Sequence, residues 1–212
     1  MKSTTNAAHR IHGLYAIAPE IDDTLALLLK VKAALEGGAR MVQYRNKQSP
    51  ANKRIEHAIA LAALCQKHSA TFIINDDLKL AWEVEADGVH LGKTDGDIAT
   101  ARKKLGPNKL IGASCYDQLD LAHAAIGAGA DYLAFGSVFA SSTKPHAARA
   151  PLALFAAAKQ FKVPLVAIGG ITVANAPEVI VAGADATAVI ASLFDAPDIR
   201  ARATEFTALF PR

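Results

Sequence analysis

Five apolar runs in this chain each stop abruptly at polar or charged residues, and this repeated pattern restricts the fold more than any other feature. The polar ends are residues 43–47, 75–77, 92–95, Ser114 and residues 141–144. Strands covered on both faces of a parallel sheet are nearly all apolar, so polar groups gather only where such strands end. We therefore predict that the five ends open onto one site.

Short β-like runs alternate with helical patterns along the whole chain, which predicts βα units and a parallel sheet. Helices are expected from Thr24, over residues 50–68, 77–85, 97–105, 117–128, 151–161 and 175–182, and from Asp198. With eight strands and eight helices, right-handed crossovers favour a closed (β/α)8 TIM barrel. Periodicity alone leaves an open, flavodoxin-like sheet as the alternative.

Two of the predicted helices carry apolar stripes, which are typical of helices that pack on a core. The stripes consist of Leu25, Leu28, Leu29 and Leu35 in the first helix and Ile55, Ile59 and Leu64 in the second.

A short connector rich in glycine recurs between a helix and the next strand, at residues 37–40, 85–88, 129–132 and 183–186. Glycine ends helices readily because it adopts the left-handed conformation. Three of these connectors contain an aspartate, namely Asp87, Asp131 and Asp185. Their place at the bottom of the barrel predicts a structural role, since barrel enzymes carry their chemistry at the opposite end.

Length and composition indicate one domain over residues 1–212, with residues 1–12 as a flexible segment. A net charge of +3 and evenly spread Lys and Arg do not indicate a nucleic-acid partner. No run approaches the ~18 apolar residues of a membrane helix. The expected location is cytoplasmic, with Cys65 and Cys115 reduced. The pattern is compatible with a homo-oligomer, because outer barrel helices can hide an interface.

The glycine pair Gly169-Gly170 follows the predicted seventh strand, and residues 188–192 end the eighth. In barrels the loops after these two strands often bind phosphate, because glycine lets backbone amides approach the anion. A tight turn is the simpler interpretation of a Gly-Gly pair. Its place after the seventh strand favours phosphate binding.

Asp76 and Asp95 stand at the ends of strands three and four, which are neighbours in the predicted barrel. Two carboxylates in one cleft repel each other unless a cation or a proton joins them, and Mg²⁺ commonly takes one or two carboxylates plus substrate phosphates. Helix capping is the competing role, which Asp77 and Asp97 can fill. We therefore predict a Mg²⁺ site at Asp76 and Asp95.

Arg45, Lys47 and Lys144 come from separate loops and could surround a diphosphate, since Arg offers a planar fork and Lys a mobile charge. Gln43, Asn75 and Ser114 lie at the same strand ends. No Ser/His/Asp nucleophile set is present in this pattern. His90, within a strand, is interpreted equally well as a buried structural imidazole or as a catalytic one.

Several ordered motifs resemble the thiamine-phosphate synthase family, also called thiamine-phosphate pyrophosphorylase, over nearly the whole chain from Leu14 to Phe194. The motifs are residues 42–47, residues 74–76, residues 86–92 with Asp95, residues 112–114, residues 143–145 and residues 167–171. Each motif is weak alone, but six in order are specific. The family joins hydroxymethylpyrimidine diphosphate to hydroxyethylthiazole phosphate and releases diphosphate.

The resemblance implies a role for each site residue. Asp76 and Asp95 would hold Mg²⁺, and Gln43 would contact the pyrimidine. Ser114 would contact the leaving group. The other implied ligands are Arg45, Lys47, Asn75 and Lys144 for the diphosphate, Ser141 and Thr143 for the thiazole, and Gly169 with the backbone near Ile190 and Ala191 for its phosphate.

Three positions depart from the family pattern. Ala191 replaces a common Ser beside the phosphate turn, Ser141 replaces a common Thr, and Lys93 stands where Gln is frequent. None removes a required group. The alternative functions are a thiazole tautomerase of the same barrel family and a non-catalytic thiamine-phosphate binding module. Asn75, Asp76, Asp95 and Lys144 together favour the synthase.

Overall fold

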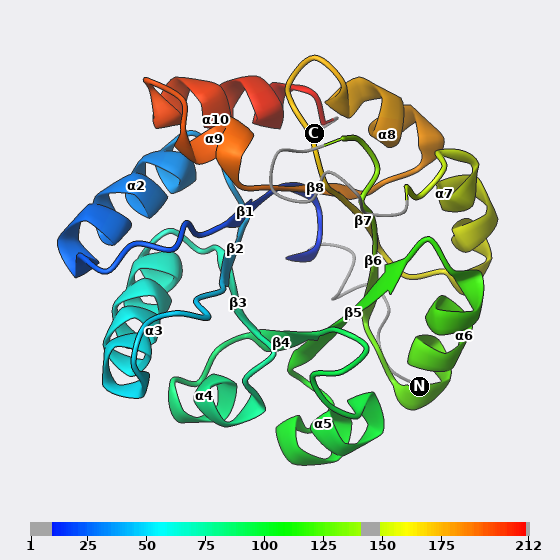
Figure 1. Cartoon of the computed structure of the whole chain (residues 1–212), viewed down its shortest axis with the longest axis horizontal. Coiled ribbons are helices and arrows are strands. Elements are labelled where there is room, and N and C mark those ends of the chain that lie inside the picture. The colour runs from blue at the N-terminus through cyan, green and yellow to red at the C-terminus, as the bar shows by residue number, and fades with distance from the viewer. Residues whose placement is uncertain (1–9, 141–148, 211–212) are drawn as a thin grey trace.

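Eight parallel strands pair in chain order and close into a barrel, with the helices arranged around it (Figure 1). The computed structural model describes residues 10–140 and 149–210. The strands are β1 (Gly13–Ile17), β2 (Met41–Tyr44), β3 (Thr71–Asn75), β4 (Gly88–Leu91), β5 (Leu110–Tyr116), β6 (Tyr132–Phe135), β7 (Leu165–Ile168) and β8 (Ala186–Val189). Pairing of β1 with β8, with Tyr15 opposite Ala188, closes the ring. The predicted (β/α)8 barrel is confirmed, and the open flavodoxin-like sheet is excluded.

The helices lie outside the ring and follow the strands in turn. Within the described residues they are α2 (Thr24–Glu36), α3 (Ala51–Lys67), α4 (Leu78–Glu83), α5 (Ile98–Leu105), α6 (Leu119–Ala128), α7 (Ala153–Ala158) with the 3-10 helix η1 (Lys159–Phe161), α8 (Ala176–Ala182), α9 (Ala191–Phe194) and α10 (Ile199–Ala208). None of the helices in these ranges is long and apolar enough to span a membrane.

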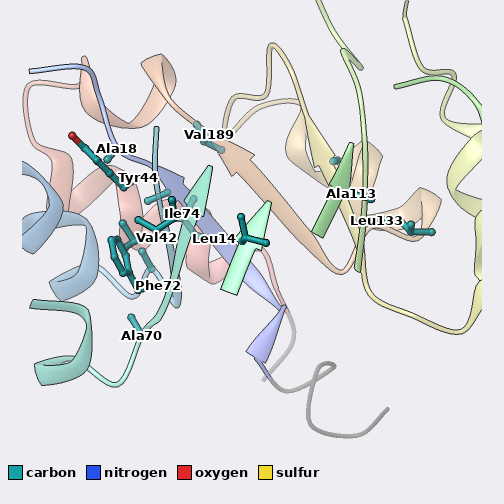
Figure 2. Packing of buried hydrophobic residues seen from close by; sticks show 14 of the residues in the cluster. Leu14, Ala18, Val42, Tyr44, Ala70, Phe72, Ile74, Ala113, Leu133 and Val189 are labelled. Carbon is teal, nitrogen blue, oxygen red and sulfur yellow. The ribbon is translucent and has the colours of Figure 1, made fainter. Parts of the chain in front are cut away.

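Successive strand residues point to opposite sides of the barrel wall, which creates two apolar layers. The inner layer consists of Ile11, Tyr15, Ile17, Met41, Ile73, Leu110, Tyr132, Ala134, Val166, Ala186 and Ala188. The outer layer lies between strands and helices, and Figure 2 shows part of it, including Leu14, Val42, Phe72 and Ile74. Large residues on some strands and alanines on others fill the interior, so the barrel is a packed core and not a pore.

Aspartates begin four of the helices. The side chains of Asp23, Asp77, Asp97 and Asp198 accept hydrogen bonds from backbone amides three residues on, at 2.7–3.0 Å. Each bond satisfies an amide that has no partner inside its helix. Since Asp77 and Asp97 are the caps, Asp76 and Asp95 are not needed for that purpose.

Three more aspartates, at the bottom of the barrel, share another arrangement of hydrogen bonds, which we call the aspartate device. A carboxylate oxygen of Asp87, Asp131 and Asp185 accepts from the amides of Phe72, Ile111 and Leu165 respectively, each at 2.8 Å. In return, the three aspartate amides donate to the carbonyl oxygens of those same residues. Each carboxylate also pairs with a cation, from Arg10, Arg102 or Lys159. Their predicted structural role is confirmed.

The predicted apolar stripes were confirmed in part: Leu35 is buried and Leu28 and Leu64 pack against the core, but the other four residues are exposed. In α2 the buried residues are Leu27, Val31, Ala34 and Leu35, whereas Leu25 and Leu29 are 66% and 58% exposed. In α3 the buried residues are His57, Ala58, Leu61 and Cys65, and Ile55 and Ile59 face outward. Both sequences carry apolar residues on more than one side, so several stripes fit each of them.

Residues 10–12 belong to the segment that we expected to be flexible, and they make definite contacts. Ile11 is fully buried in the inner layer, where it covers the bottom of the barrel. The His12 ring packs edge-on against Phe210 with 5.5 Å between centroids. Within the described residues, Ile11 is therefore already packed two residues before β1.

Candidate active site

The carboxyl ends of β2, β3 and β4 bring a lysine and two carboxylates together. Lys47 Nζ lies 3.1 Å from a carboxylate oxygen of Asp76. The Asp76 carboxyl is also within hydrogen-bonding reach of the Asp95 carboxyl. The residues predicted to bind metal are thus neighbours, with a predicted diphosphate ligand beside them.

Both the backbone conformation of Asp76 and the ionised form of its carboxyl are energetically unfavourable. Its backbone adopts a φ of 62°, in the left-handed region that non-glycine residues seldom occupy. Burial raises the pKa of its carboxyl above the ordinary value; the Lys47 ammonium opposes this shift, and the Asp95 carboxylate adds to it. Strain and charge repulsion of this kind gather at functional sites.

The position of Asp95 depends on a glycine. The Asp95 amide donates to the Gly92 carbonyl oxygen at 3.3 Å, which closes a tight turn after β4. A Cβ on Gly92 would overlap a carboxylate oxygen of Asp95. The absent side chain at residue 92 therefore leaves the place that the Asp95 carboxylate occupies.

The residues present fit a Mg²⁺ ion. Both carboxylates are hard oxygen donors, and their closeness favours a cation between them. Within residues 10–140 and 149–210, no group of three or more His, Cys, Asp or Glu side chains gathers as a metal cage. Two carboxylates match an ion that completes its shell with water and substrate phosphate oxygens.

Arg45 and Asn75 lie at the ends of the same strands. The Arg45 guanidinium donates to a carboxylate oxygen of Glu20 at 2.8 Å, across from the loop after β1. This pair is partly exposed, so an anion could compete for the guanidinium at low cost. Asn75 ends β3, where it is partly buried, and Lys93 is exposed two residues before Asp95.

Gln43 and Ser114 are connected through the interior by Tyr15, Tyr132 and His90; the two tyrosines had no predicted role in the site, and the role of His90 was left open. Gln43 Nε2 donates to the Tyr15 hydroxyl at 2.8 Å, and His90 Nε2 lies 2.9 Å from Ser114 Oγ. Tyr132 joins the two halves, with hydroxyl contacts of 3.1 Å to Tyr15 and to His90 Nδ1. The sequence could have indicated that these side chains face the interior, because every second residue of a barrel strand points inward.

Burial shifts the pKa values of three of these interior side chains. It lowers the pKa of His90 to about 4, although the nearby Asp95 charge opposes the shift. Burial likewise raises the pKa values of the Tyr15 and Tyr132 hydroxyls above the ordinary value. All three side chains are therefore uncharged at neutral pH.

The turns after β7 and β8 lie side by side, since Ile168 pairs with Ala188. Gly169 and Gly170 have φ values of 100° and 67°, which only glycine adopts freely. A Cβ on Gly170 would come within 2.7 Å of the Phe139 carbonyl oxygen. Ala191 begins α9, and Ile190 is its N-cap residue. The structure thus explains the two glycines by their backbone conformation and by close packing.

Three predicted site residues, Ser141, Thr143 and Lys144, lie outside the described residues. A separate hollow of about 720 Å³ lies at the bottom of the barrel, around Arg10, Arg40 and Asp87. Its lining contains none of the predicted site residues.

The chain is similar in sequence and fold to several known proteins. The sequence model of the family described as thiamine monophosphate synthase matches residues 14–193. The thiamine-phosphate synthase of Chromobacterium violaceum is 54% identical over 201 residues, which cover 95% of this chain and 97% of that protein. That of Methylobacillus flagellatus is 54% identical over 207 residues, covering 98% and 99%. A solved thiamine phosphate pyrophosphorylase from Pyrococcus furiosus superimposes with a TM-score of 0.81 at 37% identity, covering 93% and 94%.

Proposed function

The chain belongs to the thiamine monophosphate synthase family, and we propose that it joins hydroxymethylpyrimidine diphosphate to hydroxyethylthiazole phosphate. The products are thiamine phosphate and free diphosphate. One observation carries the proposal: Lys47, Asp76 and Asp95 meet at the ends of neighbouring strands. This combination of a cation and two close carboxylates suits a metal-bound, strongly anionic substrate.

In the proposed reaction, the bond between the pyrimidine methylene carbon and the diphosphate oxygen breaks first. The electron pair leaves with the diphosphate, and the aminopyrimidine ring shares the positive charge that develops on the methylene carbon. The thiazole nitrogen then forms the new C–N bond with its lone pair. No protein nucleophile is required, so binding geometry and electrostatic stabilisation account for the catalysis.

The chain's residues divide these tasks between them. Arg45, Lys47, Asn75 and Lys144 bind the diphosphate, while Gln43 orients the pyrimidine. The Ser114 hydroxyl donates a hydrogen bond to the departing oxygen. Asp76 and Asp95 would hold Mg²⁺, which when bound neutralises charge on the leaving diphosphate.

The second substrate is assigned to the other half of the barrel mouth. Ser141 and Thr143 contact the thiazole, whose phosphate rests on amides near Gly169, Ile190 and Ala191. Positive φ at Gly169 and Gly170, which lets the backbone approach an anion closely, supports this placement. The buried free thiols of Cys65 and Cys115 suit the reducing cytoplasm, where we place the reaction.

One assay tests the function. Purified protein is mixed with both substrates and Mg²⁺, and thiamine phosphate and diphosphate are measured. Equal amounts of the two products are expected. Conversion of a thiazole phosphate carboxylate alone would identify a tautomerase, and binding without product would identify a regulatory module; either result contradicts the synthase.

A further inference from the structure

A chain of five side chains crosses the barrel interior and ends at two proposed substrate ligands. It runs from Gln43 through Tyr15, Tyr132 and His90 to Ser114, with successive contacts of 2.8, 3.1, 3.1 and 2.9 Å. The five residues come from β2, β1, β6, β4 and β5. The first four are at least nine-tenths buried, so water does not supply substitutes for these bonds.

The hydrogen bonds can all run in one direction, from Gln43 to Ser114. The Gln43 amide nitrogen donates to the Tyr15 oxygen. Either hydroxyl of the Tyr15–Tyr132 pair can donate to the other; when Tyr15 donates, Tyr132 donates to His90 Nδ1, which then carries no hydrogen.

The consequence for Ser114 follows from the histidine tautomer. With Nδ1 as an acceptor, the one hydrogen of a neutral imidazole lies on Nε2, which donates to Ser114 Oγ at 2.9 Å. In this arrangement Ser114 accepts from His90, and its own hydroxyl hydrogen is left for a ligand.

Gly112 shows that the fold makes room for this chain. A Cβ on Gly112 would overlap the ring and hydroxyl of Tyr132, and it would also come within 2.5 Å of His90 Nδ1. The glycine has no positive φ that would otherwise require it. Tyr132 contacts His90 in the space that a side chain at residue 112 would fill.

We propose that Tyr132 and His90 are positioning residues, which fix the Ser114 hydroxyl as a hydrogen-bond donor to the leaving diphosphate. The inference rests on the proposed function, because it assigns a partner to the Ser114 hydrogen. Neither positioning residue needs to touch the substrate. The gain arises because a hydroxyl that is already oriented does not have to reorganise as charge develops on the departing oxygen.

The tautomer of His90 is the direct test, and it needs no substrate. The ¹⁵N chemical shifts of His90, assigned by their loss in His90→Gln, are expected to show hydrogen on Nε2 and none on Nδ1. In Tyr132→Phe, Nδ1 loses its donor and the two tautomers should exchange. Tyr15→Phe should leave the tautomer unchanged, since Tyr132 still donates. Hydrogen on Nδ1 in the native protein, or unchanged shifts in Tyr132→Phe, would overturn the proposal.

Kinetics supply the second test. Tyr132→Phe should lower kcat about 10-fold and leave KM for the pyrimidine diphosphate within about 2-fold, because the oriented hydroxyl matters most in the transition state. In a Ser114→Ala background the same substitution should cost nothing further. A loss that persists in full without the Ser114 hydroxyl would show that Tyr132 acts by another route.

Tyr44→Phe is the matched control. The Tyr44 hydroxyl lies 3.1 Å from His57 Nδ1, so it makes a buried tyrosine–histidine contact of the same kind, but in the outer layer. Its loss should reduce stability about as much as Tyr132→Phe and leave kcat unchanged. An equal drop in kcat in both variants would mean that general destabilisation explains the effect. Absence of synthase activity in the native protein would contradict the proposed function, whereas the His90 tautomer tests the hydrogen-bond chain separately.

Discussion

At the scale of single residues, one missing side chain determines where the Asp95 carboxylate lies. Gly92→Ala would place a Cβ on the carboxylate oxygen, which can move because it ends a short side chain. Residue 92 has no positive φ, so alanine fits the backbone. We expect normal folding and a Mg²⁺ concentration for half-maximal activity that rises about 10-fold, as for a displaced metal ligand. A Mg²⁺ titration of the initial rate measures this.

Gly127→Ala controls for the glycine substitution itself. Gly127 lies within α6, and a Cβ added to it would meet no neighbouring atom of the described residues within 4 Å. Alanine should there stabilise the protein by about 0.5–1 kcal/mol and leave the Mg²⁺ requirement unchanged. A native Mg²⁺ requirement in Gly92→Ala would argue against Asp95 as a metal ligand.

His90 should make stability depend on pH. Its folded pKa is about 4, against about 6.5 in an unfolded chain. Between these values the unfolded state binds more protons than the native state, so the free energy of unfolding falls as pH decreases through this window. The expected contribution of His90 is a loss of about 2 kcal/mol between pH 7 and pH 5.

Urea unfolding at pH 7 and pH 5 isolates this contribution. His90→Gln should remove about 2 kcal/mol of the pH-dependent loss, since glutamine does not titrate. His123→Gln, at an exposed site in α6, is the control for exchanging a histidine for glutamine. If the His90 variant loses as much stability on acidification as the native protein, His90 is not buried in its neutral form.

At the scale of helices and strands, the bottom of the barrel depends on the repeated aspartate device, and its copies differ in burial. Asp131 and its partner Arg102 are each 14% exposed, whereas Asp185 is 34% exposed beside a more accessible Lys159. Removing the Asp131 carboxylate takes away the side-chain acceptor of the Ile111 amide and leaves Arg102 with backbone carbonyl partners alone. Asp131→Ala should therefore cost about 2–3 kcal/mol and Asp185→Ala about half of that. Urea unfolding of both variants gives the comparison, and an equal cost would contradict the role of burial.

The elements also show which parts of the fold could be predicted. Strand and helix order followed from alternation and from local signals, such as the aspartate caps and the left-handed glycines Gly129 and Gly183 at helix ends. The buried side of α2 could not be predicted in full from the sequence, because leucines occupy several sides of that helix. Burial of Leu27 and exposure of Leu25 are decided by contacts with distant segments, which no local pattern contains. The short helix α9 was missed for the same reason.

At the scale of the whole molecule, local sequence indicates some of the site residues, whereas others are brought together only by the closed barrel. Asp76 and Asp95 could be predicted because each follows its own strand, and barrel closure then makes the strands neighbours. The contacts of Tyr132 with Tyr15 and with His90 span 117 and 42 residues of sequence. Only the register of the closed barrel brings these side chains together, so no single segment could indicate them.

The barrel also separates the structural aspartates at its bottom from the proposed site residues at its mouth. Asp131 precedes β6 at the bottom, whereas Gly92 follows β4 at the mouth. A four-residue strand spans about 13 Å, and substitutions that far apart without shared partners normally act independently. We expect the Gly92→Ala/Asp131→Ala double variant to show the stability loss of Asp131→Ala and the Mg²⁺ requirement of Gly92→Ala. Urea unfolding and Mg²⁺ titration of all four proteins complete the cycle. A Mg²⁺ requirement in the double variant more than about 3-fold above that of Gly92→Ala would mean that the bottom of the barrel controls the geometry of the carboxylates, because effects at independent sites add to within about 2-fold.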